Sequence, residues 1–267
     1  MIYLQQSPGV QLRSWVQSLW YCRAPRVPRR RERVLPNGCM QIIISLSHNF
    51  LTDCGDDGAA TLRLSRAIVV GARARYGVVD TVDMEEIAGI VIQPGGFAGL
   101  FRERADLFFE RSIGLEEVWA CASLADRLCE VPTPVEKLRT LEILLTGLLH
   151  RGTRRSELVD QAMHLFLEKG SSVAQCAKSV GVGERRLSQV FREYVGIAPK
   201  MWCRIRRFQA AVQTLHKGVD VPWVELALAC GYYDQSHFAN DFRAFSGVDP
   251  TTYSTHRGPW QNHVPIP

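Results

Sequence analysis

The chain of 267 residues is 46% hydrophobic and 22% charged, a composition typical of a globular protein and not of a disordered one. Its longest strongly apolar stretch, residues 141–149, is too short for a membrane span. The net charge of +5 is uneven, because residues 1–150 hold 17 basic and 17 acidic side chains whereas residues 151–267 hold 15 and 10. This asymmetry is expected when a domain that binds a polyanion follows a neutral domain.

The N-terminus and the eight cysteines predict a cytoplasmic protein that uses no cofactor. The first residues, MIYLQQSPGVQLRSW, lack the basic and apolar segments of a secretion signal. The cysteines form no CxxC pair and no Cys/His cluster at metal spacing, and His48 has no second donor near it. We therefore expect no metal site, no disulfide framework and no catalytic residues, with most thiols buried as small apolar groups.

Three runs rich in β-branched residues predict strands in the N-terminal part. They cover residues 40–46, 67–70 and 87–92, and turn-forming segments separate them. The basic run 29–33 is expected to be a solvated loop between strands. Trp15, Trp20 and Tyr21 are expected to lie in the core. The first hundred residues therefore predict a β-rich domain, for which a cupin-like barrel is one candidate architecture.

Two helices, over residues 116–129 and 134–150, are predicted to complete a regulatory domain spanning residues 1–150. The second helix carries an apolar stripe formed by Leu138, Leu141, Leu145 and Leu148. The stripe fits either packing on its own domain, which we favour at about two heptads, or the seam of a homodimer. The polar segment 151–156 is the expected linker, and from residue 157 onward we expect only helices.

A repeat of about fifty residues fills the C-terminal part. Seven positions agree at almost the same spacing, namely Ala177, Gly181, Leu187, Phe191, Gly196, Pro199 and Trp202 in the first copy and Ala227, Gly231, Phe238, Phe242, Gly247, Pro250 and Tyr253 in the second. Each copy predicts two short helices and a tight turn, because Ala permits close crossing, Gly permits positive φ, and the apolar pair faces inward. The later glycines suit helix C-terminal caps. This pattern indicates two helix-turn-helix motifs.

The polar face of the second helix in each copy carries side chains suited to binding DNA. The candidates are Arg185, Arg186, Ser188, Gln189 and Arg192 in the first copy and Gln235, Ser236, His237, Asn240 and Arg243 in the second. Amides and guanidinium groups can read base edges, and hydroxyls can bond phosphates. On a single helix, such a polar face would be interpreted as ordinary exposure to solvent, but its presence in two matched copies favours contact with DNA.

Residues 199–215 predict a helix that joins the two motifs, with apolar residues at helical spacing and no interior breaker. Its length of about 25 Å is comparable with the roughly 34 Å between successive major-groove faces on one side of a duplex. One chain could therefore occupy two adjacent major grooves of double-stranded DNA.

Residues 157–255 resemble the DNA-binding domain of AraC/XylS-type transcription regulators. The resemblance rests on GYYDQSHF at residues 231–238, continued by Phe242-Arg243 and by the Gly247, Pro250 and Tyr253 spacing. It implies a sequence-specific transcription regulator that binds DNA through both motifs, contacts RNA polymerase, and leaves residues 256–267 as a C-terminal tail. Asn240 and Asp249 differ from the family's usual residues, and Asn240 bears on base preference.

The N-terminal part is similar to a β-rich sensor-like domain of unassigned ligand that occurs on some AraC-type proteins. The similarity rests on residues 35–39, 70–73 and 92–97 and implies a site for a small-molecule effector or a partner. Two other hypotheses remain open. One is a thiol-responsive regulator acting through Cys39 or Cys54, and the other is a metal-dependent β-barrel enzyme fused to a DNA-binding domain.

Overall fold

The computed structural model describes residues 1–24, 31–55, 61–120, 123–149, 155–218, 221–258 and 260–266. Within them the N-terminal part is β-rich and forms two antiparallel sheets, not one closed barrel. The large sheet has the order β1 (Ile2–Gln6), β2 (Val16–Arg23), β9 (Glu86–Ile92), β4 (Gln41–Ser45), β7 (Ala67–Val70) and β10 (Ser112–Gly114). The small sheet has the order β11 (His263–Pro265), β3 (Arg31–Val34), β8 (Gly77–Asp80), β5 (Leu51–Asp53) and β6 (Leu62–Leu64).

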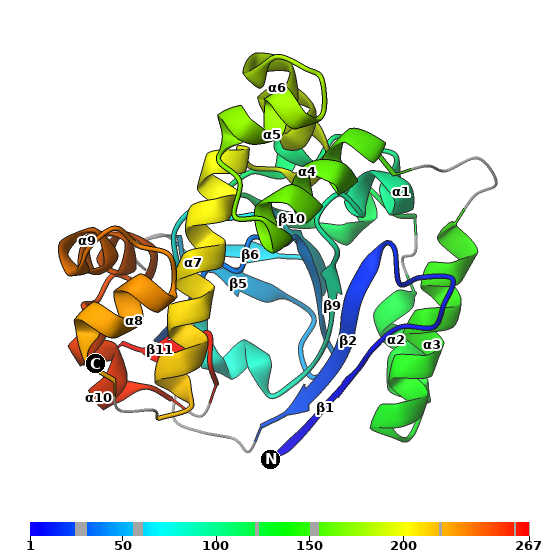
Figure 1. Cartoon of the computed structure of the whole chain (residues 1–267). Helices are drawn as coiled ribbons and strands as arrows, with labels where there is room; N and C mark the ends of the chain where they lie inside the picture. Colours follow the sequence, from blue (N-terminus) through cyan, green and yellow to red (C-terminus); the bar gives the residue numbers. More distant parts are fainter. Residues whose placement is uncertain are drawn as a thin grey trace.

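The outer face of the large sheet is closed by helices. On β4, Ile42 and Ile44 are fully buried, whereas the intervening Ile43 faces the other side and is half-buried. The helices are α1 (Phe97–Phe101), α2 (Leu124–Glu130) and α3 (Pro134–Leu148), and α3 contacts β1 and β2 (Figure 1). Leu138, Leu141 and Leu145 of α3 are fully buried. The leucine stripe therefore packs on its own domain and does not form an exposed dimer seam.

Two local predictions for the N-terminal part are wrong. Residues 116–129 do not form one helix. A 3-10 turn at Leu115–Glu117 ends before Trp119, and the Trp119 ring packs against Phe101 with the ring centroids 6.3 Å apart. Residues 31–33 of the basic run are not a loop, because β3 fills the place between β8 and β11. Residues 29–30 of that run and residues 151–154 of the expected linker lie outside the described residues.

The C-terminal part is helical up to residue 256. It comprises α4 (Glu157–Glu168), α5 (Val173–Ser179), α6 (Glu184–Val195), α7 (Pro199–His216), α8 (Trp223–Ala229), α9 (Gln235–Ser246) and α10 (Pro250–His256). In Figure 1, α7 runs between a group formed by α4, α5 and α6 and a second group formed by α8, α9 and α10. Two helix-turn-helix motifs, α5–α6 and α8–α9, are thus joined by the predicted linker helix.

The expectation of helices alone after residue 157 is wrong at the C-terminus. Residues 263–265 form β11, which pairs antiparallel with β3 of the N-terminal part. Burial explains the strand, since the Val264 side chain is 2% exposed and belongs to the hydrophobic core. That core is continuous and includes buried residues of both parts of the chain. Within the described parts of the chain, every helix is too short or too polar to span a bilayer.

Candidate nucleic-acid interface

The two helix-turn-helix motifs have the same local construction. Gly181 and Gly231 turn the chain with φ of +72° and +79°, a conformation that a side chain would strain. The residue after each glycine donates its backbone N–H to a buried alanine, Val182 to Ala177 at 3.0 Å and Tyr232 to Ala227 at 2.9 Å. The repeated spacing in the sequence therefore produces the same turn twice.

Each recognition helix, α6 and α9, ends at a glycine in the left-handed conformation. Gly196 ends α6 with φ of +93°, and Gly247 ends α9 with φ of +73°. Pro199 and Pro250 then begin α7 and α10. The predicted caps and helix starts are thereby confirmed.

Aspartates cap α9 of the second motif and α10, the helix that follows it. The Asp234 carboxylate accepts a hydrogen bond from the His237 backbone N–H at 2.7 Å at the start of α9. The Asp249 carboxylate accepts from both the N–H and the hydroxyl of Thr252, at 2.9 and 2.8 Å, at the start of α10. These bonds, above all the one from the Thr252 backbone, lower the pKa of Asp249. Asp249 thus caps the start of α10 with its carboxylate.

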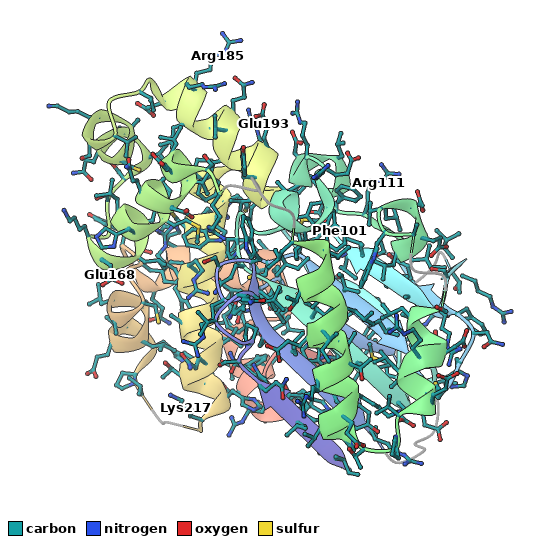
Figure 2. All side chains as sticks on the ribbon, turned by 90° about the vertical axis from the view of Figure 1, so that its right-hand side faces the viewer. Phe101, Arg111, Glu168, Arg185, Glu193 and Lys217 are labelled. Atoms are coloured by element: carbon teal, nitrogen blue, oxygen red, sulfur yellow. The ribbon has the colours of Figure 1, made fainter. Side chains whose placement is uncertain are left out.

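The apolar pair of each recognition helix is buried, and the opposite face is open to solvent. Leu187, Phe191 and Phe242 are fully buried, and Phe238 is 1% exposed. Nine of the ten DNA-binding candidates are exposed, namely Arg185, Arg186, Gln189, Arg192, Gln235, Ser236, His237, Asn240 and Arg243, and Ser188 is half-buried. Figure 2 shows Arg185 at the free end of α6, pointing away from the body of the molecule.

A partly buried ion pair, which the sequence pattern did not single out, attaches α9 to the linker helix. The Arg204 guanidinium on α7 lies 2.6 Å from the Asp241 carboxylate, and Asp241 is 4% exposed. His237 lies near the same carboxylate, with Nε2 3.9 Å from Oδ2, and its ring packs edge-on to Tyr232. His237 is therefore held by its own motif more firmly than a free surface side chain would be.

The N-terminal part reaches α6 through η2 (Ala105–Phe108) and the arginine that precedes it. Arg104 Nη1 lies 3.7 Å from Glu193 Oε1, and the Gln189 amide donates to the same oxygen at 3.0 Å. Arg104 also donates to the Asp106 carboxylate and thereby lowers the pKa of Asp106, with a smaller contribution from Arg192. Glu193 lies between α6 and the N-terminal part in Figure 2. This contact joins residues almost ninety positions apart, beyond the reach of local periodicity.

The described residues provide neither of the arrangements that the alternative hypotheses require. They contain no group of three or more His, Cys, Asp or Glu side chains that could hold a metal ion. Cys39 and Cys54 are buried, and burial raises the pKa of both thiols, that of Cys39 to about 11. A reactive thiol needs exposure and a lowered pKa.

Comparison with known proteins supports the assignment of the motifs. Residues 176–256 match the helix-turn-helix domain family, and residues 5–114 match a domain family of unknown function, DUF6597. The virulence regulon transcriptional activator VirF of Yersinia enterocolitica is 28% identical over 109 residues, which are 41% of this chain and 40% of that protein. The transcriptional regulator ExsA of Pseudomonas aeruginosa is 26% identical over 95 residues, 34% of each chain.

The architecture of the whole chain also has a solved counterpart. ToxT from Vibrio cholerae aligns with a TM-score of 0.50 over 96% of this chain and 98% of its own, at 10% identity. That likeness shows the fold, a β-rich N-terminal part followed by a helical C-terminal part. The C-terminal part is thus a helix-turn-helix domain of the class with which transcription regulators bind DNA. It contains two such motifs, α5–α6 and α8–α9, which α7 joins.

Proposed function

We propose that the protein is a cytoplasmic, sequence-specific transcription regulator, and not an enzyme, that inserts α6 and α9 into adjacent major grooves of double-stranded DNA. The observation that carries this proposal is the pair of matched recognition helices whose polar faces stay exposed although the N-terminal part packs against the same domain. The linker helix α7 has 18 residues and a length of about 27 Å. It supports a fixed spacing of the two motifs on one side of the duplex.

The ten candidate side chains divide into two chemical roles. Arg185, Gln189, Gln235 and Asn240 have the donors and acceptors that match base edges in the major groove. Ser236 and His237 lie in the first turn of α9, where phosphates are bound well, and the Ser188 hydroxyl in the second turn of α6 can bond a phosphate. Arg186, Arg192 and Arg243 add charge for phosphate contacts. Sequence preference would then come from two short base clusters, one for each motif.

The N-terminal part would modulate binding through residues 71–76, the loop between β7 and β8. A Cβ atom at Gly196 would lie 3.3 Å from the Cβ of Ala72, and one at Gly247 would lie 2.5 Å from Tyr76 Cε1. The same loop carries Arg73, which lies 3.0 Å from Asp53 Oδ2 inside the N-terminal part. A small-molecule effector that moved this loop would shift the ends of both recognition helices, and contact with RNA polymerase would complete the regulatory function.

Selection of random duplex DNA by the purified full chain tests the proposal, followed by binding at several salt concentrations. We expect two enriched base clusters about one helical turn apart, with affinity that falls steeply as salt rises. The double variant Arg185→Ala/Gln189→Ala should lose preference at one cluster and Gln235→Ala/Asn240→Ala at the other. A single cluster, or variants that both affect the same cluster, would contradict placement in two grooves.

A further inference from the structure

The large sheet has an inner face, on the side opposite to the face that the helices cover. This inner face lines a cavity of about 960 Å³. Cross-strand register places Trp20, Gly89, Ile43 and Ile68 in one row across this face. The Trp20 indole covers Gly89, because a Cβ atom at that position would lie 2.2 Å from the ring. Glycine therefore lets the indole lie flat against the sheet.

This inner face is apolar but only half-buried. On the outer face of the same strands Leu19, Ile42 and Ile90 are fully buried, whereas Trp20 and Ile43 on the inner face are each partly exposed. Apolar side chains in a concave site of this volume are typical of a small-molecule pocket. The inner face of the sheet is thus an apolar surface that the other described residues leave partly uncovered.

One end of the cavity carries carboxylates. Asp53, Asp80 and Asp83 all line it, and Asp83 is 6% exposed. Asp83 Oδ2 is buried without a hydrogen-bond partner among the described residues. A buried carboxylate without a partner is costly unless a cation or donor joins it. Among the described residues that line the cavity, Asp83 is thus the one whose buried side-chain oxygen lacks a hydrogen-bond partner.

The arginines of the lining have partners other than Asp83. Arg73 pairs with Asp53 at 3.0 Å, Arg257 donates to the Ser254 carbonyl at 2.7 Å, and the Arg206 guanidinium lies 5.8 Å from the centroid of the Trp202 ring. These three guanidinium groups therefore already have contacts of their own.

We propose that this cavity binds a small organic cation, a protonated amine on an apolar or aromatic body. The ammonium group would pair with Asp83, and the apolar body would lie on Trp20 and Ile43. Gln209 and Gln213 of α7 and residues 260–263 also line the cavity, so an occupant could touch the DNA-binding part as well. This inference deepens the function proposed above, since it names the chemical class of the effector.

Calorimetric titration of the full chain tests the cavity with three probes that share a phenethyl group, namely phenethylamine, 2-phenylethanol and 3-phenylpropionate. We expect phenethylamine to bind about tenfold or more tightly than the other two. Asp83→Asn should remove that preference, and Ile43→Trp should weaken amine binding by occupying the apolar surface beside Trp20. Asp126→Asn and Ile143→Trp, at exposed positions of α2 and α3, are the matched controls and should bind like wild type.

Equal binding of amine and acid, no binding of the amine, or an amine affinity unchanged in Asp83→Asn would overturn the inference. Because Ile43→Trp could perturb folding, the Asp83→Asn comparison decides, with thermal melting as a check on both variants. DNA affinity measured in the same samples separates this inference from the proposed function. Amine binding by protein that selects no DNA would contradict only the DNA-binding proposal, whereas DNA selection without amine binding would contradict only the cavity.

Discussion

Arg204 and Asp241 join the linker helix to the second recognition helix through an ion pair of 2.6 Å, and the first motif has no counterpart because Val190 takes the place of Asp241. Asp241 is 4% exposed, whereas the Arg204 side chain is 30% exposed. Removal of Arg204 and removal of Asp241 should therefore lower the free energy of unfolding by different amounts. A buried carboxylate left alone is more expensive than an arginine that can reach water.

Arg204→Met should therefore lower the free energy of unfolding by about 2 kcal/mol, a value reduced from that of a fully buried pair because Arg204 is partly exposed. Asp241→Val introduces the residue found at the matching position of the first motif and should lower the free energy of unfolding by less. Urea unfolding of both variants and of Arg204→Met/Asp241→Val completes a double-mutant cycle, in which the double variant should be more stable than Arg204→Met. Additive losses would show that the ion pair does not couple the helices.

Arg185→Ala and Gln235→Ala should each cost about 1–3 kcal/mol of binding free energy on the selected duplex and relax base preference at one position. Arg185 lies at the exposed end of α6 and Gln235 begins α9. Fluorescence anisotropy on the selected and on a scrambled duplex measures the effect. An equal loss on both duplexes would assign the side chain to phosphate contact. Arg127→Ala and Gln161→Ala, exposed residues outside both motifs, serve as controls.

Gly231→Ala should destabilise the protein by about 1–3 kcal/mol, because φ of +79° strains any residue with a Cβ atom. The nearest atom to that Cβ would be Arg207 Cδ at 3.4 Å, so the cost is conformational and not a clash. Gly147→Ala is the matched control with the opposite sign. Gly147 lies in α3 with open space around it, and alanine there should stabilise by about 0.5–1 kcal/mol. Thermal melting that moves both variants the same way would contradict the assigned turn.

Asp249→Ala should lower the free energy of unfolding by about 1 kcal/mol at pH 7, because the α10 cap is lost. Asp249→Ser keeps a capping oxygen and should lower it by less. The folded-state pKa of Asp249 is lowered, so its carboxylate stabilises the protein above the unfolded pKa of about 4. That stabilisation is lost as pH falls from about 4 through the folded pKa. Urea unfolding at pH 7 and pH 3 should therefore show the wild type losing its advantage over Asp249→Ser in acid.

Thiol labelling at pH 7.5 should leave Cys39 and Cys54 unmodified in the folded protein, since both are buried and burial raises the pKa of each. Cys129 should react first among the described cysteines, because it is exposed and its sulfur accepts a hydrogen bond from Arg66 at 3.0 Å. Mass spectrometry of labelled peptides identifies the sites and separates Cys129 from Cys121, which lies outside the described residues. Rapid labelling of Cys39 would revive the thiol-responsive hypothesis.

The C-terminal domain could be predicted in detail because its constraints are local and occur twice. Gly181 and Gly231 mark positive φ, and each alanine and apolar pair lies within one motif, so spacing alone defines the turn. The sheets could be predicted only as strands, since their order depends on pairing between distant segments. The cavity was beyond prediction for the same reason. Trp20 was expected in the core, and only the cross-strand register shows that it lies over Gly89.

The pairing of β11 with β3 also constrains how the protein reaches its fold. His263 Nδ1 lies 3.0 Å from Glu32 Oε2, a contact between residues 231 positions apart, and Leu35 donates its backbone N–H to the Asn262 carbonyl at 2.8 Å. During synthesis, β3 therefore cannot pair with β11 until the helical domain has been synthesised. Contacts of such high sequence separation slow folding and are gained late. The two parts of the chain should then complete folding together, as one cooperative unit.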